Sequence, residues 1–535
     1  MIPRSVKFGC LIVLSCGSGE IGNPQTVRSQ TSANGSHDSS ANGGPNSGDG
    51  GLFAEASSPK DGGVTPSGDA GGPSVINVDC PKLTSITADA NTVYVRADYT
   101  GSESGTKTAP YKTVASAFKN APDGAKIFIA AGTYGESLDV PNKNLSVYGG
   151  FASSFGSRTD ACASILESSS TSKAVLTAVY SVKSFSLDGV TVRKGSHGFT
   201  VDGDSGVPTK YSFTNSVFTK NGTTSENGGA LYLSRVTATV RGNVIKANIA
   251  ARGAAVAASG DVEVTIDNNL VAENLGYSDH GGGLYLGCRK QTVTHNTIRS
   301  NEIGKGISYG GWGGGLLVYG GDGDVSYNVY VDNLAGVGGG LFVDDDGHLV
   351  EHHDIFFRNR AYQTSEGETR GNAIYIDGTG GGPSGGSSID ATNLTIVDNV
   401  YNENRQVAAK VRGSAFFLER DSKLTLRNSI LWNNGDLPFY ADTANTIAVS
   451  YTLAPSKCSG TGSCTFGAGL FYQDPLFADP AKDDYHLKSK SARWNPATQS
   501  WTTDSVTSPA LNKGDANGTP VELGAYGGTA EASKP

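Results

Sequence analysis

Several features are absent from the sequence, and each absence excludes a class of protein. Acidic residues outnumber basic ones, 51 to 42, and no basic stripe occurs, so we expect no binding to nucleic acid or to an anionic membrane surface. No stretch beyond the N-terminus is apolar for long enough to span a bilayer, which predicts a soluble body. The chain also has no CxxC or Cys/His metal spacing, no supported Ser/His/Asp order, and no phosphate-binding or dinucleotide fingerprint.

Glycine, by contrast, is abundant, and much of it belongs to a repeat. A glycine run followed by a short apolar strand occurs at residues 228–233, 281–286, 313–318 and 338–343, with degraded copies beginning at Gly253, Gly371 and Gly413. Each copy is followed by a strand that ends in an asparagine: Asn248, Asn274, Asn301, Asn333, Asn359 and Asn399. The unit has no helical period and is too short for a strand–helix pair, so its recurrence predicts a stacked solenoid.

Alternation within the repeat predicts two inward columns. The first is Leu231, Val256, Leu284, Leu316, Leu341, Ile374 and Phe416, and the second is Leu233, Ala258, Leu286, Val318, Val343, Ile376 and Leu418. Because both columns are apolar throughout, we expect an all-β, right-handed parallel β-helix in which each turn adds one rung. We interpret the asparagines as a structural ladder of stacked amides at left-handed turn positions rather than as a site.

The N-terminus has the features of an export signal, with Arg4 and Lys7 before a short apolar core. Residues 13–16 resemble a bacterial lipobox, which would make Cys16 a lipid-modified first residue after a signal peptide of residues 1–15. A Gly/Ser/Asn-rich tether is expected over residues 16–79. We therefore expect a lipoprotein of the outer membrane or cell surface, attached to the membrane through lipid only, or alternatively a secreted protein.

Three further parts are expected: an entry module at 80–170, repeat coils at 171–440 and a C-terminal coil and cap at 441–535. In an oxidising compartment Cys458 and Cys464 are predicted to form a disulfide, because they flank a short Ser/Gly/Thr loop. Cys80, Cys162 and Cys288 lie too far apart in sequence for a pairing to be predicted.

The order of motifs after residue 93 resembles a known family. Residues 105–114, a short helix expected over 115–120, and residues 123–134 together resemble the entry module of pectate-lyase-like β-helix proteins, the family called DUF1565. That resemblance implies a helix that caps the first coil. The repeat is also similar to that of the chlamydial polymorphic outer-membrane proteins. Residues 474–477, 484–487, 508–512 and 523–526 resemble a closing segment that packs over the last coil.

An outward aromatic column is the first candidate site. It contains Tyr232, Tyr285, Phe342, Tyr375 and Phe417, interrupted by Ala257 and Leu317. An exposed row of rings suits sugar faces, so we expect a binding face for a polysaccharide or another cell-surface ligand. The alternative is that loops such as 304–312 fold back and bury these rings.

Acidic turns next to this column are the second candidate. Five aspartates are possible ligands for Ca²⁺, a cofactor that we regard as an option rather than a requirement: Asp322, Asp324, Asp344, Asp345 and Asp346. In uronate lyases calcium offsets a sugar carboxylate while Lys or Arg removes a proton, a role open here to Lys290 or Arg289. The alternative is that these are ordinary solvated turns. His348, His352 and His353 lie close together and could supply an acid/base pair, whereas His280 is interpreted as a turn residue.

Two functions remain open from the sequence. The first is a non-catalytic surface protein that presents a rigid face to a polysaccharide, and the second is a carbohydrate-active enzyme, either a lyase or a hydrolase with paired carboxylates. The longest loops lie within residues 360–370, 378–388 and 401–412. If they converge on the Tyr375 face an enzyme is favoured, and if they scatter, surface display is favoured.

Overall fold

A computed structural model describes residues 71–179, 182, 184–203, 209–304, 310–378, 386–515 and 522–535. The expected signal peptide, Cys16 and the tether up to residue 70 therefore lie outside the described residues. By its contacts the chain divides into residues 1–61 and residues 62–535, and the account below concerns the second unit. None of the described helices is long and apolar enough to cross a membrane.

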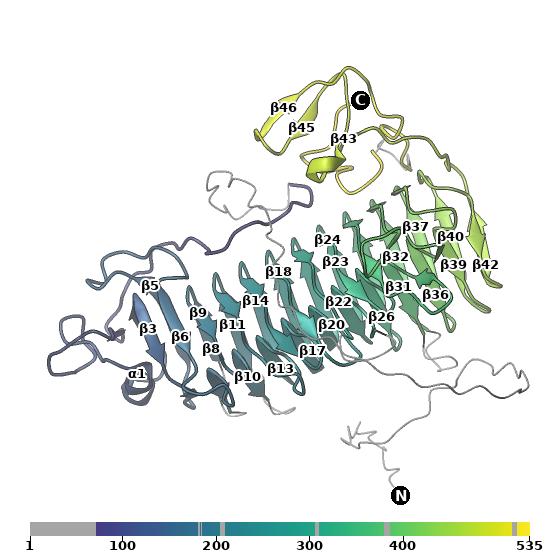
Figure 1. Ribbon diagram of the computed structural model, residues 1–535. Helices are drawn as coiled ribbons and strands as arrows, with labels where there is room; N and C mark the ends of the chain where they lie inside the picture. The colour runs from purple at the N-terminus through teal and green to yellow at the C-terminus, as the bar shows by residue number, and fades with distance from the viewer. Residues whose placement is uncertain are drawn as a thin grey trace, which may run out of the picture. The chain divides into compact units, whose positions relative to one another are not determined.

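Each turn of the chain contributes one short strand to each of three parallel ladders, which we call faces A, B and C (Figure 1). Face A contains β4 (Leu138–Val140), β7 (Leu176–Ala178), β10 (Phe199–Asp202), β13 (Leu231–Ser234), β22 (Leu316–Tyr319), β26 (Leu341–Asp344), β31 (Ile374–Asp377), β36 (Phe416–Glu419), β39 (Phe439–Ala441) and β41 (Cys458–Ser459). Face B contains β1 (Val93–Val95), β2 (Ala125–Ala130), β5 (Leu145–Phe151), β8 (Ser184–Asp188), β11 (Lys210–Thr214), β14 (Thr237–Arg241), β23 (Asp322–Ser326), β27 (His348–His352), β32 (Ser388–Thr392), β37 (Lys423–Arg427), β40 (Thr446–Ser450) and β42 (Ser463–Phe466). The long strands β17 (Val256–Asp267) and β20 (Leu284–Thr294) run through both faces.

Face C is an 11-stranded sheet of mostly three-residue strands. Its members are β3 (Gly132–Gly135), β6 (Ser164–Glu167), β9 (Thr191–Arg193), β12 (Val217–Thr219), β15 (Val244–Lys246), β18 (Leu270–Ala272), β21 (Thr297–Arg299), β24 (Val329–Val331), β28 (Ile355–Phe357), β33 (Thr395–Val397) and β38 (Ile430–Trp432). Short additional pairs are β16 (Ile249–Ala250) with β19 (Leu275–Gly276), and β25 (Leu334–Ala335), β29 (Arg360–Ala361) and β34 (Tyr401–Asn402) in a row.

The predicted inward columns are confirmed. Leu231 pairs in register with Val256, Val256 with Leu284, and the same column continues to Phe416. Every member of both columns is buried. Since each rung adds apolar side chains to one continuous interior, the core extends along the whole stack.

The asparagine ladder is also present, but its turn geometry differs from the expectation. The amide nitrogen of Asn248 donates to Oδ1 of Asn274, and this contact repeats at each following rung as far as Asn434. The left-handed residue is the one before each asparagine, such as Ala247 with φ 55° or Glu273 with φ 58°. The role of the asparagines is therefore hydrogen bonding, because their side-chain amides bond to buried backbone N–H and C=O groups in the corner.

A second ladder runs along the corner between faces B and C. Asn243, Asn269, Asn296 and Asn328 are bonded in the same way, each amide donating to the next residue of the row. The row ends at Asp354, which accepts from Asn328. We did not predict this ladder, because its residues follow face-B strands whose sequences differ more from one repeat copy to the next.

Helix α1 (Val114–Asn120) lies where the family resemblance implies it. Thr113 caps it by accepting from the backbone N–H of Ser116, and Val114, Ala117 and Phe118 are buried. The ring of Phe118 meets that of Phe185 edge-on. The helix thus joins the hydrophobic core beside the first coils and covers it at this end.

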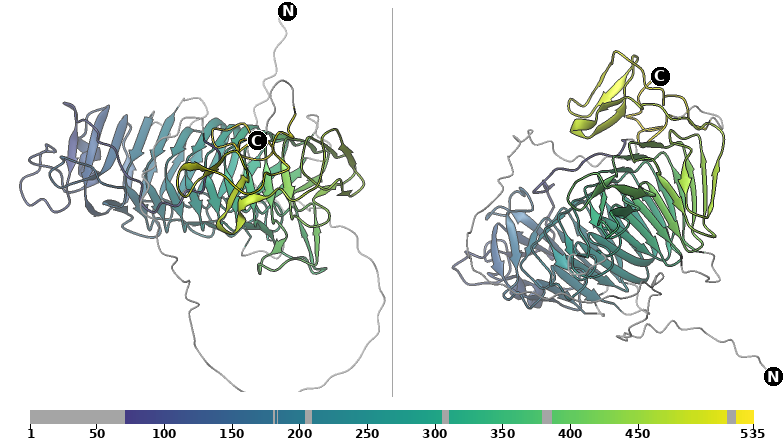
Figure 2. Two further views of the ribbon diagram at one scale, coloured as in Figure 1. Left: turned by 90° about the horizontal axis from the view of Figure 1, so that it is seen from above. Right: turned by 45° about the vertical axis from the view of Figure 1, so that its right-hand side comes forward.

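The far end is arranged differently from the prediction. The last strands, β41 and β42, carry Cys458 and Cys464, and these two cysteines form a disulfide. The closing segment does not pack over this last coil: Phe477, Tyr485 and Leu523 join a cluster on the outside of face C that runs from Val329 to Leu453. Figures 1 and 2 show the C-terminal residues (yellow) alongside β24 rather than beyond β42. The reason is that face C presents apolar side chains outward along this stretch, and burying them is favourable.

This C-terminal segment has its own strands, β43 (Phe477–Asp479), β44 (Asp484–Leu487), β45 (Arg493–Asn495) and β46 (Ser500–Thr502), joined in antiparallel pairs. A 3₁₀ turn (Pro480–Lys482) links the first two. His353 and Asn393 at the edge of face B contact the backbone carbonyl of Gly527, which helps to hold the segment in place.

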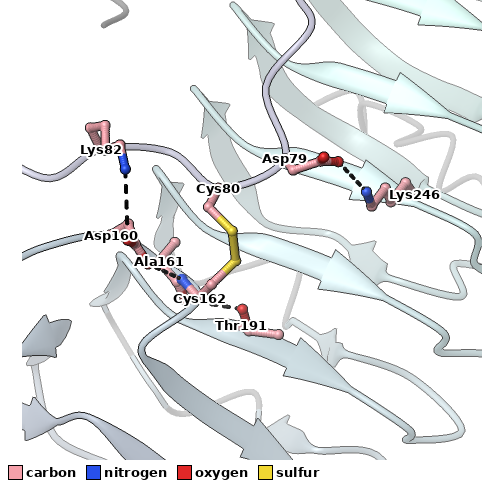
Figure 3. Close-up of a disulfide and its surroundings, with 8 residues drawn as sticks. All are labelled: Asp79, Cys80, Lys82, Asp160, Ala161, Cys162, Thr191 and Lys246. Atoms are coloured by element: carbon pink, nitrogen blue, oxygen red, sulfur yellow. Dashed lines mark hydrogen bonds and ion pairs between the residues drawn. A yellow bond between two sulfur atoms is a disulfide. The ribbon is translucent and has the colours of Figure 1, made fainter. Parts of the chain in front are cut away.

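The expected tether ends earlier than residue 79. Residues 74–80 run along the outside of face C, where the N–H of Ile76 donates to Thr297 Oγ1. Asp79 pairs with Lys246 of β15 (Figure 3). Cys80 forms a disulfide with Cys162, a pairing we did not predict across 82 residues. We call residues 71–80 the N-terminal strap.

Candidate functional site

The outward column of face A is a stack of rings rather than an open surface. The rings of Phe342, Tyr375, Phe417 and Tyr440 stack with centroids 4.1 to 5.1 Å apart. Phe342 is 1% exposed, Tyr375 5% and Phe417 2%, so the prediction of an exposed aromatic binding face is wrong for these three. Tyr232 and Tyr285 are partly exposed.

The glycine turns themselves cover the rings. Gly371 has φ 54°, and a Cβ placed on it would lie 2.7 Å from the Tyr375 ring. A Cβ placed on Gly281 would lie 2.9 Å from Cβ of Tyr285, and one placed on Gly338 would lie 3.0 Å from the side chain of Phe342. Glycine is required at this turn because the chain bends back directly over the column.

Two of the three long loops meet at this place. β30 (Glu368–Arg370) pairs in parallel with β35 (Lys410–Arg412), and Glu368, 1% exposed, binds the guanidinium groups of both Arg370 and Arg412. Arg370 lies within the electrostatic reach of Tyr375 and Glu419. The third loop falls largely outside the described residues. The loops at 360–370 and 401–412 thus converge on the Tyr375 face, the arrangement that favours an enzyme.

A column of acidic side chains lies beside the rings. Tyr319 pairs in register with Asp344, Asp377 pairs with Glu419, and Asp344 and Asp377 follow the paired residues Val343 and Ile376. Neighbouring rungs therefore hold Asp344, Asp377 and Glu419 in a row, at a spacing of ~4.8 Å per rung. We call these three residues the carboxylate column.

Burial changes the acidity of this column. It raises the pKa of Asp377 to about 7, and the charges of Asp344 and Glu419 act in the same direction, while Arg420 opposes them at 3.4 Å. Oδ1 of Asp377 is buried without a hydrogen-bond partner. Burial also raises the pKa of Asp344. One rung thus carries a carboxyl group that holds a proton near neutral pH.

The five aspartates proposed for calcium do not come together. Asp322 and Asp324 belong to face B, where they pair with His348 and Val350, whereas Asp344 lies on face A and Asp345 and Asp346 in the turn after it. The separation arises because a turn divides faces A and B in the coils that carry these aspartates. Among the described residues, only Cys80, Asp160 and Cys162 bring three such ligand atoms within 4.8 Å of one another, and both cysteines are in the disulfide.

The candidate bases of a lyase lie away from the carboxylate column. Arg289 is paired with Asp261 at 3.0 Å and with Glu263 at 2.8 Å, and its hydrogen bond with Glu263 raises its pKa. A base needs the opposite shift, so Arg289 does not fit the role. Lys290 is exposed on face B, in register with Glu263 and Asp322.

The three histidines named from the sequence occupy different positions. His348 contacts Ser388, while His352 and His353 contact each other through their Nδ1 atoms at 2.9 Å. His353 also stacks on Tyr327 and reaches Gly527, and burial lowers its pKa to about 4. This pair supports the C-terminal segment and lies on a different face from the carboxylate column.

A histidine that we interpreted as a turn residue lies close to the carboxylate column instead. His280 Nδ1 is 2.9 Å from Oδ1 of Asp279, and its ring centroid is 4.8 Å from that of Trp312 and 6.0 Å from that of Tyr319. Asp344 lies within its electrostatic reach. The only sequence signal for this position of His280 is that it precedes a glycine run. Its neighbours come from three coils of unequal length, so the sequence alone does not identify them.

Comparison with known proteins agrees with the fold. The family model for a right handed beta helix region matches residues 176–384, and one described as disaggregatase related matches residues 356–514. No curated protein matches the sequence. The chain therefore has a right-handed parallel β-helix fold.

Solved structures with similar coils include three carbohydrate-active proteins. Pectate lyase Pel9A is 12% identical, with a TM-score of 0.39 over 82% of this chain and 97% of that one. An alginate lyase from Paenibacillus sp. str. FPU-7 is 11% identical (TM-score 0.30; 70% and 98% covered), and a GH136 lacto-N-biosidase from Eubacterium ramulus is 9% identical (TM-score 0.30; 71% and 68% covered). Similarities this low carry no information on activity.

Proposed function

We propose that this protein is a carbohydrate-active enzyme that hydrolyses a glycosidic bond at the carboxylate column of face A. The observation that carries the proposal is the row of Asp344, Asp377 and Glu419 on neighbouring rungs, with Asp377 buried and protonated near neutral pH. Hydrolysis of this kind needs a protonated carboxyl group beside an ionised one.

Asp377 is the general acid in this scheme and donates its proton to the leaving oxygen. The carboxylate of Asp344 or Glu419, one rung away, is the nucleophile and bonds to the anomeric carbon as the bond to the leaving oxygen breaks. Water, deprotonated by the Asp377 carboxylate, then hydrolyses this glycosyl-enzyme bond. Neighbouring rungs are ~4.8 Å apart, close to the separation of about 5 Å found in retaining enzymes, whereas a water-activating base would need a wider gap. The expected products therefore retain the anomeric configuration.

The other hypotheses from the sequence receive less support. A lyase that uses Lys290 or Arg289 needs those side chains at the acidic site, and both lie on the face-B part of β20. A purely displaying surface needs exposed rings, and most of the column is buried. Binding without cleavage remains the alternative function, and calcium remains a proposal without an assembled ligand set.

Export, lipid attachment at Cys16 and a surface or secreted location also belong to the proposal. Two disulfides, Cys80–Cys162 and Cys458–Cys464, support an oxidising compartment. The finer family assignments, to DUF1565 and to a repeat like that of the chlamydial polymorphic outer-membrane proteins, rest on the motifs alone.

The test uses the full chain without residues 1–15 and a panel of neutral and acidic glycans, with reducing ends and unsaturated products followed in parallel. Reducing ends without unsaturation, abolished in Asp377→Asn and retained in Asp390→Asn, are the expected result. Asp390 is a matched control because it is an exposed aspartate on β32 of the neighbouring face. Unsaturated products, or hydrolysis that survives Asp377→Asn, would contradict the proposal.

A further inference from the structure

We propose that His280, Tyr285, Trp312 and Tyr319 form a binding subsite for one uncharged sugar ring, next to the carboxylate column. The inference deepens the proposed function, because it assigns a substrate class to the same face. It stands on three observations: an arrangement of partly exposed rings, a histidine packed between Asp279 and Trp312, and local negative charge.

The rings come from three consecutive segments and form an open cluster. Tyr285 of β20 and Tyr319 of β22 have centroids 6.3 Å apart with 37° between their planes, and Tyr319 is 38% exposed. Trp312 is partly exposed and packs between His280 and Phe342, at 4.8 and 6.5 Å. These rings thus differ from Tyr375 and Phe417, which are fully covered, and their faces and polar tips suit the apolar faces and hydroxyls of a sugar.

His280 lies beside a salt bridge that begins in the preceding coil. Arg252 binds both oxygens of Asp279, at 2.7 and 3.1 Å, and Asp279 faces His280 Nδ1 at 2.9 Å. Although burial opposes ionisation, His280 and Arg252 keep the pKa of Asp279 well below its usual range. His280 Nδ1 is buried without a hydrogen-bond partner despite this contact, so the imidazole is positioned by Asp279 and by packing on Trp312, and we assign Nε2 to a sugar hydroxyl.

The charge around the cluster selects against acidic sugars. Asp344 lies next to Tyr319 in the ladder, and Asp345 and Asp346 follow it in the same turn. Asp345 bonds to Tyr319, and burial together with this carboxylate raises the pKa of the phenol to about 12. Among the basic side chains nearby, Arg252 is already engaged by Asp279. A uronate would meet like charge here, whereas a neutral ring would not.

The experiment measures binding, so that it does not depend on cleavage. The Asp377→Asn protein is titrated calorimetrically with neutral hexasaccharides (β-1,4-linked glucose, xylose, mannose and N-acetylglucosamine) and with hexagalacturonate and hexamannuronate. We expect at least one neutral hexasaccharide to bind, and each uronate to bind roughly tenfold more weakly or not at all. Adding Trp312→Ala, Tyr319→Ala or His280→Ala should weaken the neutral ligand roughly tenfold each.

Tyr472→Ala is the control, because Tyr472 is a 52% exposed tyrosine that packs on Trp432 elsewhere. Tyr319→Phe, which keeps the ring, should retain most of the affinity, and near-ultraviolet circular dichroism checks the fold of each variant. Preference for a uronate, or unchanged binding in both Trp312→Ala and Tyr319→Ala, would overturn the subsite. If the variants bind as expected but the wild-type protein cleaves no glycan, the proposed hydrolase activity is refuted and the subsite stands. If the wild-type protein cleaves a glycan but the variants do not bind as expected, the subsite is refuted and the hydrolase activity stands.

Discussion

The phenol ring of Tyr375 stacks on the ring of Phe417 one rung away, with centroids 4.7 Å apart and 14° between the planes. Both side chains point away from the interior of the coils, yet both are buried. Face A thus has a second, outer layer of packing, and the carboxylate column lies at its edge. Several outward aromatic residues that the alternating sequence pattern assigns to a binding surface therefore stabilise the fold instead.

Replacing a ring of this outer stack should therefore destabilise the protein as a core substitution would. Phe417→Ala is expected to lower the free energy of unfolding by about 3–5 kcal/mol, because it removes a buried ring between Tyr375 and Tyr440. Tyr232→Ala, at the partly exposed end of the same column, should cost about 1–2 kcal/mol. Urea denaturation followed by circular dichroism measures both. Equal, small effects would mean that the stack is exposed after all.

The asparagine ladder predicts a specific cost for losing one amide. In Asn301→Ala the carbonyl of Val271 and Oδ1 of Asn333 lose a donor, and Asn274 loses its acceptor. Oδ1 of Asn333 keeps the backbone N–H of residue 301 as a donor, and the loss of the other bonds should lower the free energy of unfolding by about 2–4 kcal/mol. Ser300→Ala, at the left-handed residue just before it, is the control and should cost less than Asn301→Ala in the same urea titration.

The sequence predicts the interior of this protein better than its exterior. Alternation distinguishes Leu231 from Tyr232, and the repeat aligns Asn248 with Asn274, because both patterns follow from one coil alone. What covers an outward residue depends on the next turn of the chain, so alternation alone predicts an exposed Tyr375. The neighbours of His280 could not be predicted because they depend on the lengths of the insertions in three coils. The pairing of Cys80 with Cys162 could not be predicted because it depends on the path of the N-terminal strap.

The raised pKa of Asp377, which suits a general acid, should make the stability of the protein depend on pH. Its pKa rises from 3.8 to about 7 on folding, so the folded state binds more protons than the unfolded state between these values. Its contribution is therefore fully present below pH 3.8 and is lost as pH rises toward 7, a change on the order of 4 kcal/mol. Asp377→Asn should remove this dependence, so the variant gains stability over the wild type as pH rises from 5 to 8. Parallel denaturation curves at both pH values would contradict the buried, protonated carboxyl.

Glu351 should also make the protein less stable as pH rises, because burial raises its pKa as well. It points inward from β27, between Val325 and Ala391, and both of its carboxyl oxygens are buried without a partner. Burial raises its pKa well above the usual range, so the folded protein holds it neutral. Glu351→Val, which restores the residue type of the rung before it, should stabilise the protein more at pH 8 than at pH 5. Differential scanning calorimetry at the two pH values measures this, and Val350→Ala, at the exposed neighbouring position, should shift both melting temperatures alike.

Loss of the disulfide between Cys80 and Cys162 should first affect the N-terminal strap. Cys80–Cys162 ties residues 71–80 to the coils, together with Asp79–Lys246 and the bonds to Thr297. Cys80→Ser with Cys162→Ser should expose the strap to protease and uncover the apolar outer side chains of β12, β15 and β18 beneath it. Loss of the disulfide should also lower global stability by about 2–4 kcal/mol. Limited proteolysis with mass spectrometry locates the first cut, and cleavage that begins in the coils rather than in the strap would show that the disulfide instead holds the coils together.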